Sequence, residues 1–455
     1  MSGAATQLGG FTRRAAPARG LRPTVLFGLV ALLTVCYLLF DLWVSRKWRA
    51  DLTQEIGPVS GWLVPIFLAY IPAVVIGFLI FTLSLGRYRH TELVPPAGGW
   101  PPVTIVIAAW NEQESIAETL EQLARLEYDG TVEVVLADNN STDETAVRAA
   151  AAATALGLRY RRVLEPSPGK HHALNTAFKT VETPLVVTVD ADTLLHRSAL
   201  AYLVAAVCAR PQGQHVSAVA GALFAQNPKR RLLTRMQAWD YKLGINGVKR
   251  MQAAYNSTLV AQGAFSVYWS EDLAAVGGWP DAIGEDIVLT WNLMASRGVI
   301  RYEPLAVAFT AVPGELSQLL SQRSRWARGM FEGLRANPPH SQPRVLAKFV
   351  AGIDYLVPLL DIGVIFFWLP GVILFLTGNP IIFSWWSMLV IPVTLLIFGL
   401  MRRWQERHVF RRLGIDQERD SGGFAAYLFL YQPMISAAAL RGYVQYATGR
   451  ARRWR

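Results

Sequence analysis

The sequence predicts a soluble α/β domain inserted between membrane-spanning helices. Composition is one reason, because 52% of the residues are hydrophobic and only 17% are charged, as is typical of a chain partly embedded in lipid. The order of the segments is the other. Long apolar runs lie on both sides of a central block in which short apolar strands alternate with amphipathic helices. Such alternation favours βαβ units and a mostly parallel sheet.

Charge and cysteine content narrow the class of protein. The net charge is +11, which in a membrane protein more often reflects basic cytoplasmic flanks than nucleic-acid binding. No homeodomain, zinc-finger or RNA-binding signature accompanies this charge, so we expect no nucleic-acid partner. The two cysteines, Cys36 and Cys208, provide no disulfide framework, in keeping with a reducing compartment.

The N-terminal part of the chain is expected to be a membrane anchor. Residues 1–23 lack apolar periodicity and predict a disordered cytoplasmic tail. Residues 24–90 predict two transmembrane helices, at 24–44 and about 62–85, each long enough to cross about 30 Å of hydrocarbon. Arginines in the tail and in the cluster at 87–90 place both of these ends in the cytoplasm.

The central block, residues 100–337, is expected to be a cytoplasmic domain. Strands are predicted at 103–108, at 132–137, near 159–164 and in the apolar run that ends at Asp190. Helices fill the intervals between them, so the carboxyl ends of the strands should lie at one edge of the sheet.

The C-terminal part, residues 345–441, predicts an interfacial helix and two or three transmembrane segments. The expected spans lie at about 355–377, 380–400 and 424–440. The last of these carries Gln432 and Pro433 in its middle, so a crossing and a re-entrant segment both remain open. Residues 442–455 form a basic tail.

Two carboxylates separated by one alanine, Asp190 and Asp192, close the most apolar strand. Ligands bind at this edge of an open α/β sheet, and a hard divalent cation carrying a diphosphate matches such a pair. Solvated loop acids are the alternative interpretation. Asn111 and Glu112 follow the first strand and Asp138 follows the second, which favours a shared nucleotide-binding edge.

Two predicted helix starts carry charged side chains. Lys170 opens the helix of Gly169-Lys-His-His-Ala-Leu-Asn, where an ammonium and a helix N-terminus together can bind a diphosphate; a solvated lysine is the alternative. Glu285 and Asp286 open another helix. They either complement the helix dipole or supply a base, which an acceptor alcohol needs before it can attack a sugar. Asp286 is the candidate for that base.

The stretch Gln322-Arg-Ser-Arg-Trp326 is the most specific motif. On a helix, Gln322, Arg325 and Trp326 lie one turn apart and share a face. The guanidinium can clamp a diphosphate and the indole can stack on a sugar ring. A basic interfacial helix beside the membrane is the alternative interpretation.

Together these motifs resemble the processive family-two glycosyltransferases, which include the cellulose, chitin, hyaluronan and poly-N-acetylglucosamine synthases. The resemblance rests on four elements in order: Asp138-Asn-Asn-Ser-Thr-Asp, Asp190-Ala-Asp192, Glu285-Asp286 and Gln-Arg-Ser-Arg-Trp at 322–326. Gly-Lys-x-x-Ala-Leu-Asn at 169–175, Ala-Val-Gly-Gly-Trp at 275–279 and Tyr-Glu-Pro at 302–304 are most similar to the bacterial poly-β-1,6-N-acetylglucosamine synthases.

The resemblance implies a GT-A catalytic domain between transmembrane α-helices, with Mg2+ or Mn2+ as cofactor. It implies donor contacts that include the uracil at Asp138 and a metal held by Asp192 with Asp190 beside it. The implied donor-binding residues are Asn111, Glu112, Asp138, Lys170, Asp190 and Arg325.

The resemblance also implies that Asp286 is the general base with Glu285 beside it. The implied acceptor-binding residues are Gln322, Trp326 and Gly263. Two positions depart from the family pattern. Asn139 stands where a second aspartate is usual, and Gly284 stands where a threonine often precedes Glu-Asp. These departures bear on the donor contacts and on the positioning of the base.

The implied function is inverting, processive polymerisation of a UDP-sugar, with UDP-N-acetylglucosamine favoured, into an exported β-linked polysaccharide. The expected location is the bacterial inner membrane, where the bilayer, the growing polymer and a small accessory subunit are possible partners. A non-processive transferase to a lipid acceptor and a β-glucan synthase that uses UDP-glucose are alternatives. A transporter with a nucleotide-binding domain is disfavoured, because the sequence has no Gly-x-x-x-x-Gly-Lys loop.

Overall fold

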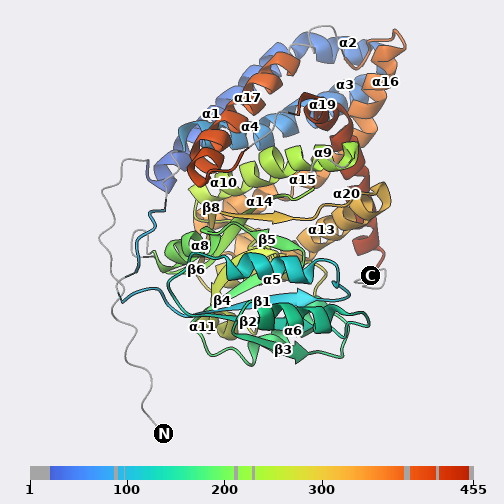
Figure 1. Cartoon of the computed structure of the whole chain (residues 1–455). Helices are drawn as coiled ribbons and strands as arrows, with labels where there is room; N and C mark the ends of the chain where they lie inside the picture. Colours follow the sequence, from blue (N-terminus) through green and yellow to red (C-terminus); the bar gives the residue numbers. More distant parts are fainter. Residues whose placement is uncertain are drawn as a thin grey trace.

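A computed structural model describes most of the chain. It covers residues 21–86, 91–96, 98–209, 214–227, 231–383, 390–416 and 420–449. Several predicted features lie wholly or partly outside these residues: most of the N-terminal tail, the cluster at 87–90, part of the 380–400 segment and the end of the basic tail. Figure 1 shows two tiers, with helices from both ends of the chain gathered above a sheet and its covering helices.

The lower tier is built on one mixed sheet of eight strands in the order β3-β2-β1-β4-β7-β6-β8-β5. Strands β3, β2, β1 and β4 are parallel, β7 is antiparallel to both of its neighbours, and β5 is antiparallel to β8. The strands are β1 Val103–Ala109, β2 Val132–Asp138, β3 Tyr160–Leu164, β4 Leu185–Asp190, β5 Thr193–Leu195, β6 Val216–Ala225, β7 Phe265–Trp269 and β8 Val299–Thr310.

Strand side chains alternate between the two faces of this sheet. Ile105 and Ile107 pack with α5, α6 and α8 on one face. Val106 and Val186 pack with α7 and α12 on the other. The helices of this tier are α5 Ile116–Ala124, α6 Thr145–Ala155, α7 Lys170–Phe178, α8 Ala199–Cys208, α11 Ser270–Ala275 and α12 Glu285–Ala295.

The register of the parallel strands brings their polar ends together. Ala109 pairs with Asp138 across β1 and β2, and Ala108 pairs with Asp190 across β1 and β4. The carboxylates that follow these buried strands therefore meet at one edge of the sheet, as the strand pattern predicts.

Helices of the upper tier come from both ends of the chain. Among the described residues, four helical segments are long and apolar enough to cross a membrane: Pro23–Val44, Pro58–Leu85, Val345–Leu376 and Ser421–Ala447. They comprise α1 Pro23–Val44; α3 Pro58–Pro65, η1 Ile66–Tyr70 and α4 Ile71–Leu85; α14 Val345–Ile353, α15 Val357–Gly363, η5 Val364–Trp368 and α16 Leu369–Leu376; and α19 Ser421–Ala426, η8 Tyr427–Tyr431 and α20 Gln432–Ala447. A short helix, α2 Arg46–Ile56, joins the first two.

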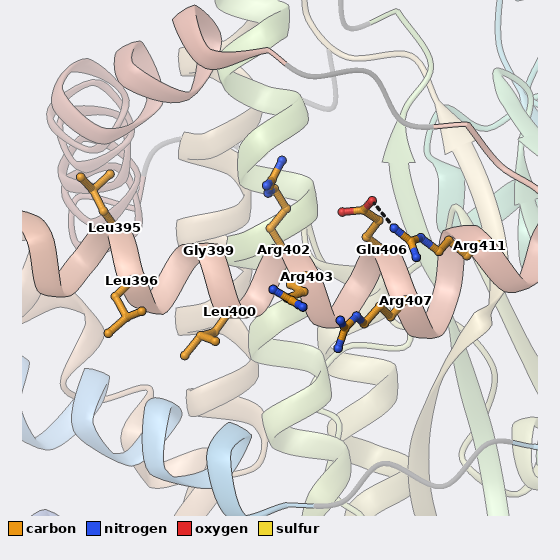
Figure 2. Close-up of a pocket in the computed structure, with 9 residues that line it drawn as sticks. All are labelled: Leu395, Leu396, Gly399, Leu400, Arg402, Arg403, Glu406, Arg407 and Arg411. Carbon is orange, nitrogen blue, oxygen red and sulfur yellow. Dashed lines mark hydrogen bonds and ion pairs between the residues drawn. The ribbon is translucent and has the colours of Figure 1, made fainter.

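Helix α17 (Val390–Gln405) covers the second half of the expected 380–400 segment and continues through η7 Glu406–Phe410 into α18 Arg411–Leu413. Figure 2 shows Leu396, Leu400, Arg403 and Arg407 along one side of this helix, with the leucines first and the arginines after them. A helix that passes from hydrocarbon into the headgroup region shows this order.

Three further elements lie between the tiers (Figure 1): α9 Leu232–Trp239, the π-helical turn η3 Asp240–Ile245, and α10 Asn246–Ala254. Helix α10 packs against both α4 and β8. The long helix α13, Leu316–Ala336, packs along α20 and also against α12. These elements connect the sheet to the apolar helices.

Candidate active site

Asp138 ends β2 with a fully buried side chain. Arg162 from β3 donates to its Oδ2 from Nε at 2.9 Å and from Nη2 at 2.5 Å, and the Ser141 N–H donates to Oδ1 at 2.9 Å. A buried carboxylate needs such partners to remain ionised. The sequence analysis did not identify Arg162, because the pairing of β2 with β3, and not a local motif, places it beside Asp138.

Asn139, a departure from the family pattern, ties down the loop that leads to Lys170. Its Oδ1 accepts from the Gly169 N–H at 2.8 Å, and its Nδ2 donates to the carbonyl of Ser167 at 2.6 Å. An aspartate could accept the first bond but has no N–H for the second. The asparagine therefore has a structural role in placing the start of α7.

Asn111 has a similar structural role in the neighbouring loop. It has a positive φ of 57°, and its Oδ1 accepts from the Thr142 N–H at 2.8 Å. Glu112 is half-buried and accepts from the Ser115 hydroxyl at 2.9 Å. Both side chains lie near the carboxyl edge, where Asp138 and Asp190 end their strands.

Lys170 lies at the centre of the acidic edge. Its Nζ is 2.5 Å from Asp190 Oδ1 and 3.9 Å from Glu285 Oε1. Burial alone would lower the pKa of Lys170, but these two carboxylates outweigh it and raise the pKa above its ordinary value. Gly263 leaves room for the ammonium, because a Cβ at that position would lie 2.9 Å from Nζ.

Glu285 and Asp286 form the first turn of α12 and differ in exposure. Glu285 is buried, and burial together with Asp286 raises its pKa, although Lys170 opposes the shift. Asp286 is only partly buried. Its Oδ2 accepts from the Gly263 N–H at 3.2 Å and its Oδ1 accepts from the Ile287 N–H at 2.9 Å. Asp286 is thus the more accessible carboxylate and is held by two backbone groups.

The other departure from the family pattern, Gly284, has a packing reason. A Cβ at Gly284 would lie 2.6 Å from the Cα of Gly329 in α13. The start of α12 therefore touches α13 backbone to backbone, and a threonine would separate the two helices. This contact brings the Gln322–Trp326 motif beside the Glu285-Asp286 turn.

Asp192 lies just beyond β4, and its Oδ1 is 3.3 Å from the hydroxyls of Thr193 and Thr310. Burial, reinforced by the charges of Asp190 and Glu112, raises the pKa of Asp192 to about 7. Like charges gathered in this way favour a cation among them. In the described part of the chain, no three His, Cys, Asp or Glu side chains lie close enough to form a complete metal cage. Two carboxylates fit Mg2+ or Mn2+, since Mg2+ is usually held by one or two carboxylates and completed by substrate phosphates and water.

The Gln322–Trp326 motif lies on α13. Oε1 of Gln322 is buried without a hydrogen-bond partner among the described residues. Arg325 is half-buried; burial lowers its pKa and the nearby charge of Glu285 opposes the shift. The indole of Trp326 is 40% exposed, so one of its faces remains available for stacking even though the Arg323 guanidinium lies 4.2 Å from the ring centroid.

Arg323 was not singled out by the sequence analysis, yet it ties this helix to η3 and to η8. Its Nη2 lies 2.8 Å from Asp240 Oδ2 in η3 and 2.8 Å from the Tyr431 hydroxyl, and all three side chains are buried. Both partners are far away in the sequence, so no local signal could have identified the cluster.

Comparison with known protein families identifies the family of this chain. The family model described as "Glycosyltransferase like family 2" matches residues 101–329. The chain belongs to glycosyltransferase family 2. The match covers the whole sheet and ends in α13, just after the Gln322–Trp326 motif, so it includes every predicted site residue.

Curated family 2 relatives are named poly-beta-1,6-N-acetyl-D-glucosamine synthase. The chain is 31% identical to that of Staphylococcus aureus (strain COL) over 242 residues and 30% identical to that of Staphylococcus epidermidis over 233 residues. Each alignment covers 51% of this chain and 55% of the relative. The chain thus spans about half the length of the curated relatives it matches.

The fold is GT-A, as the resemblance implies. The mannosyltransferase PcManGT from Pyrobaculum calidifontis, solved in complex with GDP-Man and Mn2+, superposes with a TM-score of 0.58 over 86% of this chain and 99% of its own, at 20% identity. The protein is therefore a glycosyltransferase with a GT-A domain flanked by apolar helices.

Proposed function

We propose that the protein is an inverting, processive glycosyltransferase of the bacterial inner membrane. It transfers N-acetylglucosamine from UDP-N-acetylglucosamine to the end of a growing β-linked polysaccharide and exports the polymer between its apolar helices. The names of the curated relatives support the product, and the four apolar helical segments support a membrane location. The catalytic domain faces the cytoplasm, where UDP-sugars are made.

The donor occupies the carboxyl edge of the sheet. Asp138 is the proposed uracil contact; its carboxylate is buried against Arg162, so donor binding would have to expose it before it could accept the imide N–H. Lys170 and Arg325 supply positive charge for the diphosphate. Asp192 and Asp190 would hold a Mg2+ or Mn2+ ion, which would neutralise charge on the diphosphate.

Asp286 accepts the proton of the acceptor hydroxyl. The hydroxyl oxygen forms a bond to the anomeric carbon as the bond from that carbon to the β-phosphate oxygen breaks, and the electron pair leaves with UDP. Attack from the opposite side inverts the anomeric configuration. The Gly263 N–H orients the carboxylate, and an exposed face of Trp326 stacks on the acceptor sugar. Gln322, whose amide oxygen is buried without a partner among the described residues, would bind the same sugar once that oxygen becomes accessible.

The observation that carries this proposal is the position of Asp286 beside the Lys170–Asp190 pair. Gly263 links them: its N–H binds Asp286 and its Cα faces the Lys170 ammonium. A base and a diphosphate-binding cation are therefore held against one glycine, so that both could act on one bound sugar diphosphate.

Product analysis tests the proposal. Purified full-length protein is incubated with Mg2+ or Mn2+ and with radiolabelled UDP-N-acetylglucosamine or UDP-glucose, and any polymer is digested with linkage-specific hydrolases. We expect a polymer of N-acetylglucosamine. A glucose polymer would favour a β-glucan synthase, a single sugar on extracted lipid would favour a non-processive transferase, and no incorporation would contradict the proposal. Adding a candidate accessory subunit tests whether a partner is needed.

A further inference from the structure

Lys249 is a buried lysine outside the donor-binding edge. It lies on α10 with 8% of its surface exposed. Its Nζ donates to the carbonyl of Val260 at 2.6 Å and to Oε1 of Gln262. Both of these acceptors are neutral. No salt bridge joins Lys249 to a carboxylate in the part of the chain that the structure describes.

A buried ammonium without an ion-pair partner is unfavourable, and a hydrophobic side chain of the same length would suit a packed core better. Burial accordingly lowers the pKa of Lys249 to about 7, and the charge of Asp286 is what opposes this shift. The side chain lies within electrostatic reach of the candidate base, and its two hydrogen bonds to Val260 and Gln262 offset part of the burial cost. Its hydrogen bonds hold the segment that contains Val260 and Gln262.

That segment, residues 260–263, is fixed from several sides. The Ala261 N–H donates to the Thr290 hydroxyl at 2.9 Å, and the Gln262 amide donates to the carbonyl of Gly221 at 2.6 Å. Lys249 binds the segment at Val260 and Gln262. The next residue is Gly263, whose N–H donates to Asp286 Oδ2. The Lys249 contact and the base contact are therefore made by adjacent residues, Gln262 and Gly263.

We propose that Lys249 is a positioning residue for sugar transfer: by holding residues 260–263 it keeps the Gly263 N–H on Asp286 and the Gly263 Cα against Lys170. The inference rests on the proposed function, in which Asp286 is the base. Lys249 does not touch the substrate in this account. Its loss would let the Gly263 peptide move, and a shift of about 1 Å at such a site can reduce turnover about 100-fold.

The helix that carries Lys249 also contacts the upper tier. Helix α10 packs on α4, the guanidinium of Arg250 lies 3.8 Å from the ring centroid of Trp404, and Gly247 faces the methyl group of Met401. Figure 1 shows α10 between the apolar helices and the sheet. Lys249 thus links residues 260–263 to α10, and α10 itself packs against the apolar helices.

The test compares Lys249→Met, which keeps the length and removes the charge, with Lys249→Gln, which keeps a donor without the charge. Lys242→Met is the matched control. Lys242 lies two turns earlier in the same helical stretch, and its ammonium is over the rings of Trp239 and Phe410 at 5.0 Å and 5.3 Å, away from residues 260–263. Full-length proteins are assayed for kcat, for the KM of UDP-N-acetylglucosamine, for UDP binding and for thermal unfolding.

We expect Lys249→Met to lower kcat at least tenfold while donor KM and UDP binding stay within twofold; the unfolding measurement shows that the variant is folded. Lys249→Gln should lie between this variant and wild type, and Lys242→Met should keep kcat within twofold. If Lys249→Met does not fold, Lys249→Gln is decisive: it should lower kcat and leave donor KM and UDP binding unchanged. Wild-type kcat in the folded variants, or a parallel loss of kcat and UDP binding, would overturn the proposal.

This outcome is distinct from a failure of the proposed function. If wild-type protein makes no polymer, or if Asp286→Asn is fully active, the proposed function fails. If wild type is active, Asp286→Asn is inactive and Lys249→Met is as active as wild type, only the role of Lys249 fails.

Discussion

Lys170 Nζ lies 2.5 Å from Asp190 Oδ1 at the point where α7 begins beside the end of β4. This pair neutralises one of the acids at the carboxyl edge and leaves Asp192 to respond to a cation. A bound diphosphate would compete for the same ammonium, so the pair is expected to loosen when the donor binds.

Replacing Lys170 with Gln should weaken donor binding. The variant loses a charge-assisted contact to the diphosphate, which is typically worth about 1.5–3 kcal/mol, or about 10-fold to 150-fold in Kd. Isothermal titration with UDP measures the change. Lys179→Gln, at the exposed end of α7, is the control and should bind as wild type does. Equal binding by the Lys170 variant would rule out the diphosphate contact.

Metal binding should depend on pH through Asp192. Its pKa is raised to about 7, so below that pH the carboxylate is protonated and cannot ligate a cation. The affinity for Mn2+ should then fall about tenfold per pH unit below pH 7 and level off above it. Titrations of the full-length protein between about pH 5.5 and pH 8.5 measure this slope, and Asp192→Asn should flatten it. A wild-type affinity that is constant over this range would refute the assignment.

The same shift affects stability without metal. The folded-state pKa of Asp192 lies above the ordinary value of about 3.9, so the native state holds the proton more tightly than the unfolded state does. Asp192 therefore makes the metal-free protein less stable as pH rises from about 4 to about 7. In Asp192→Asn, this contribution to the pH dependence of the unfolding temperature should be absent.

Replacing Gly263 with Ala should impair transfer. The new methyl group would lie 2.9 Å from Lys170 Nζ and must displace the ammonium from its place beside Asp190. We expect kcat/KM to fall at least tenfold while the unfolding temperature changes by only a few degrees. Gly314→Ala is the control, because a Cβ there meets nothing within 4 Å. Wild-type kcat/KM in Gly263→Ala would mean that the ammonium can move without consequence.

Replacing Arg323 with Met should destabilise the fold more than removing a surface ion pair. It leaves Asp240 as a buried charge without its cation, and such a loss typically costs about 3–5 kcal/mol. Arg148→Met removes the exposed pair with Glu144 and should cost less than about 1 kcal/mol. Denaturant unfolding of the two variants in the same detergent compares them. Similar stabilities would show that the buried cluster does not hold α13.

Much of the lower tier could be predicted from the sequence because buried parallel strands are continuous apolar runs. The expected strand at 103–108 is observed at Val103–Ala109, and the run that ends in Asp190 is β4. The meeting of Asp138 and Asp190 at one edge followed from parallel pairing alone. By contrast, the antiparallel position of β7 beside β4 depends on long-range pairing that no local pattern contains.

The contacts that fix the site were harder to predict, because their partners are distant in the sequence. Arg162 reaches Asp138 through strand pairing. Lys249 lies in no recognisable motif, so the sequence did not indicate its contacts. The last apolar segment is a further case. Gln432 and Pro433 left its conformation open, but α19, η8 and α20 follow one another without a break, and Pro433 comes directly after the π-helical turn η8, a local widening of the helix. The segment Ser421–Ala447 is therefore helical throughout.

Asp286 is the proposed base for transfer from UDP-N-acetylglucosamine. The most direct measurement is the initial rate of polymer formation by full-length wild type, Asp286→Asn and the control Asp129→Asn, which alters an exposed loop carboxylate. UDP binding is measured in parallel to show that each donor site is intact. We predict that Asp286→Asn binds UDP as wild type does but forms polymer at least 100-fold more slowly, while Asp129→Asn is unaffected. Polymer formation by Asp286→Asn at the wild-type rate would contradict the account.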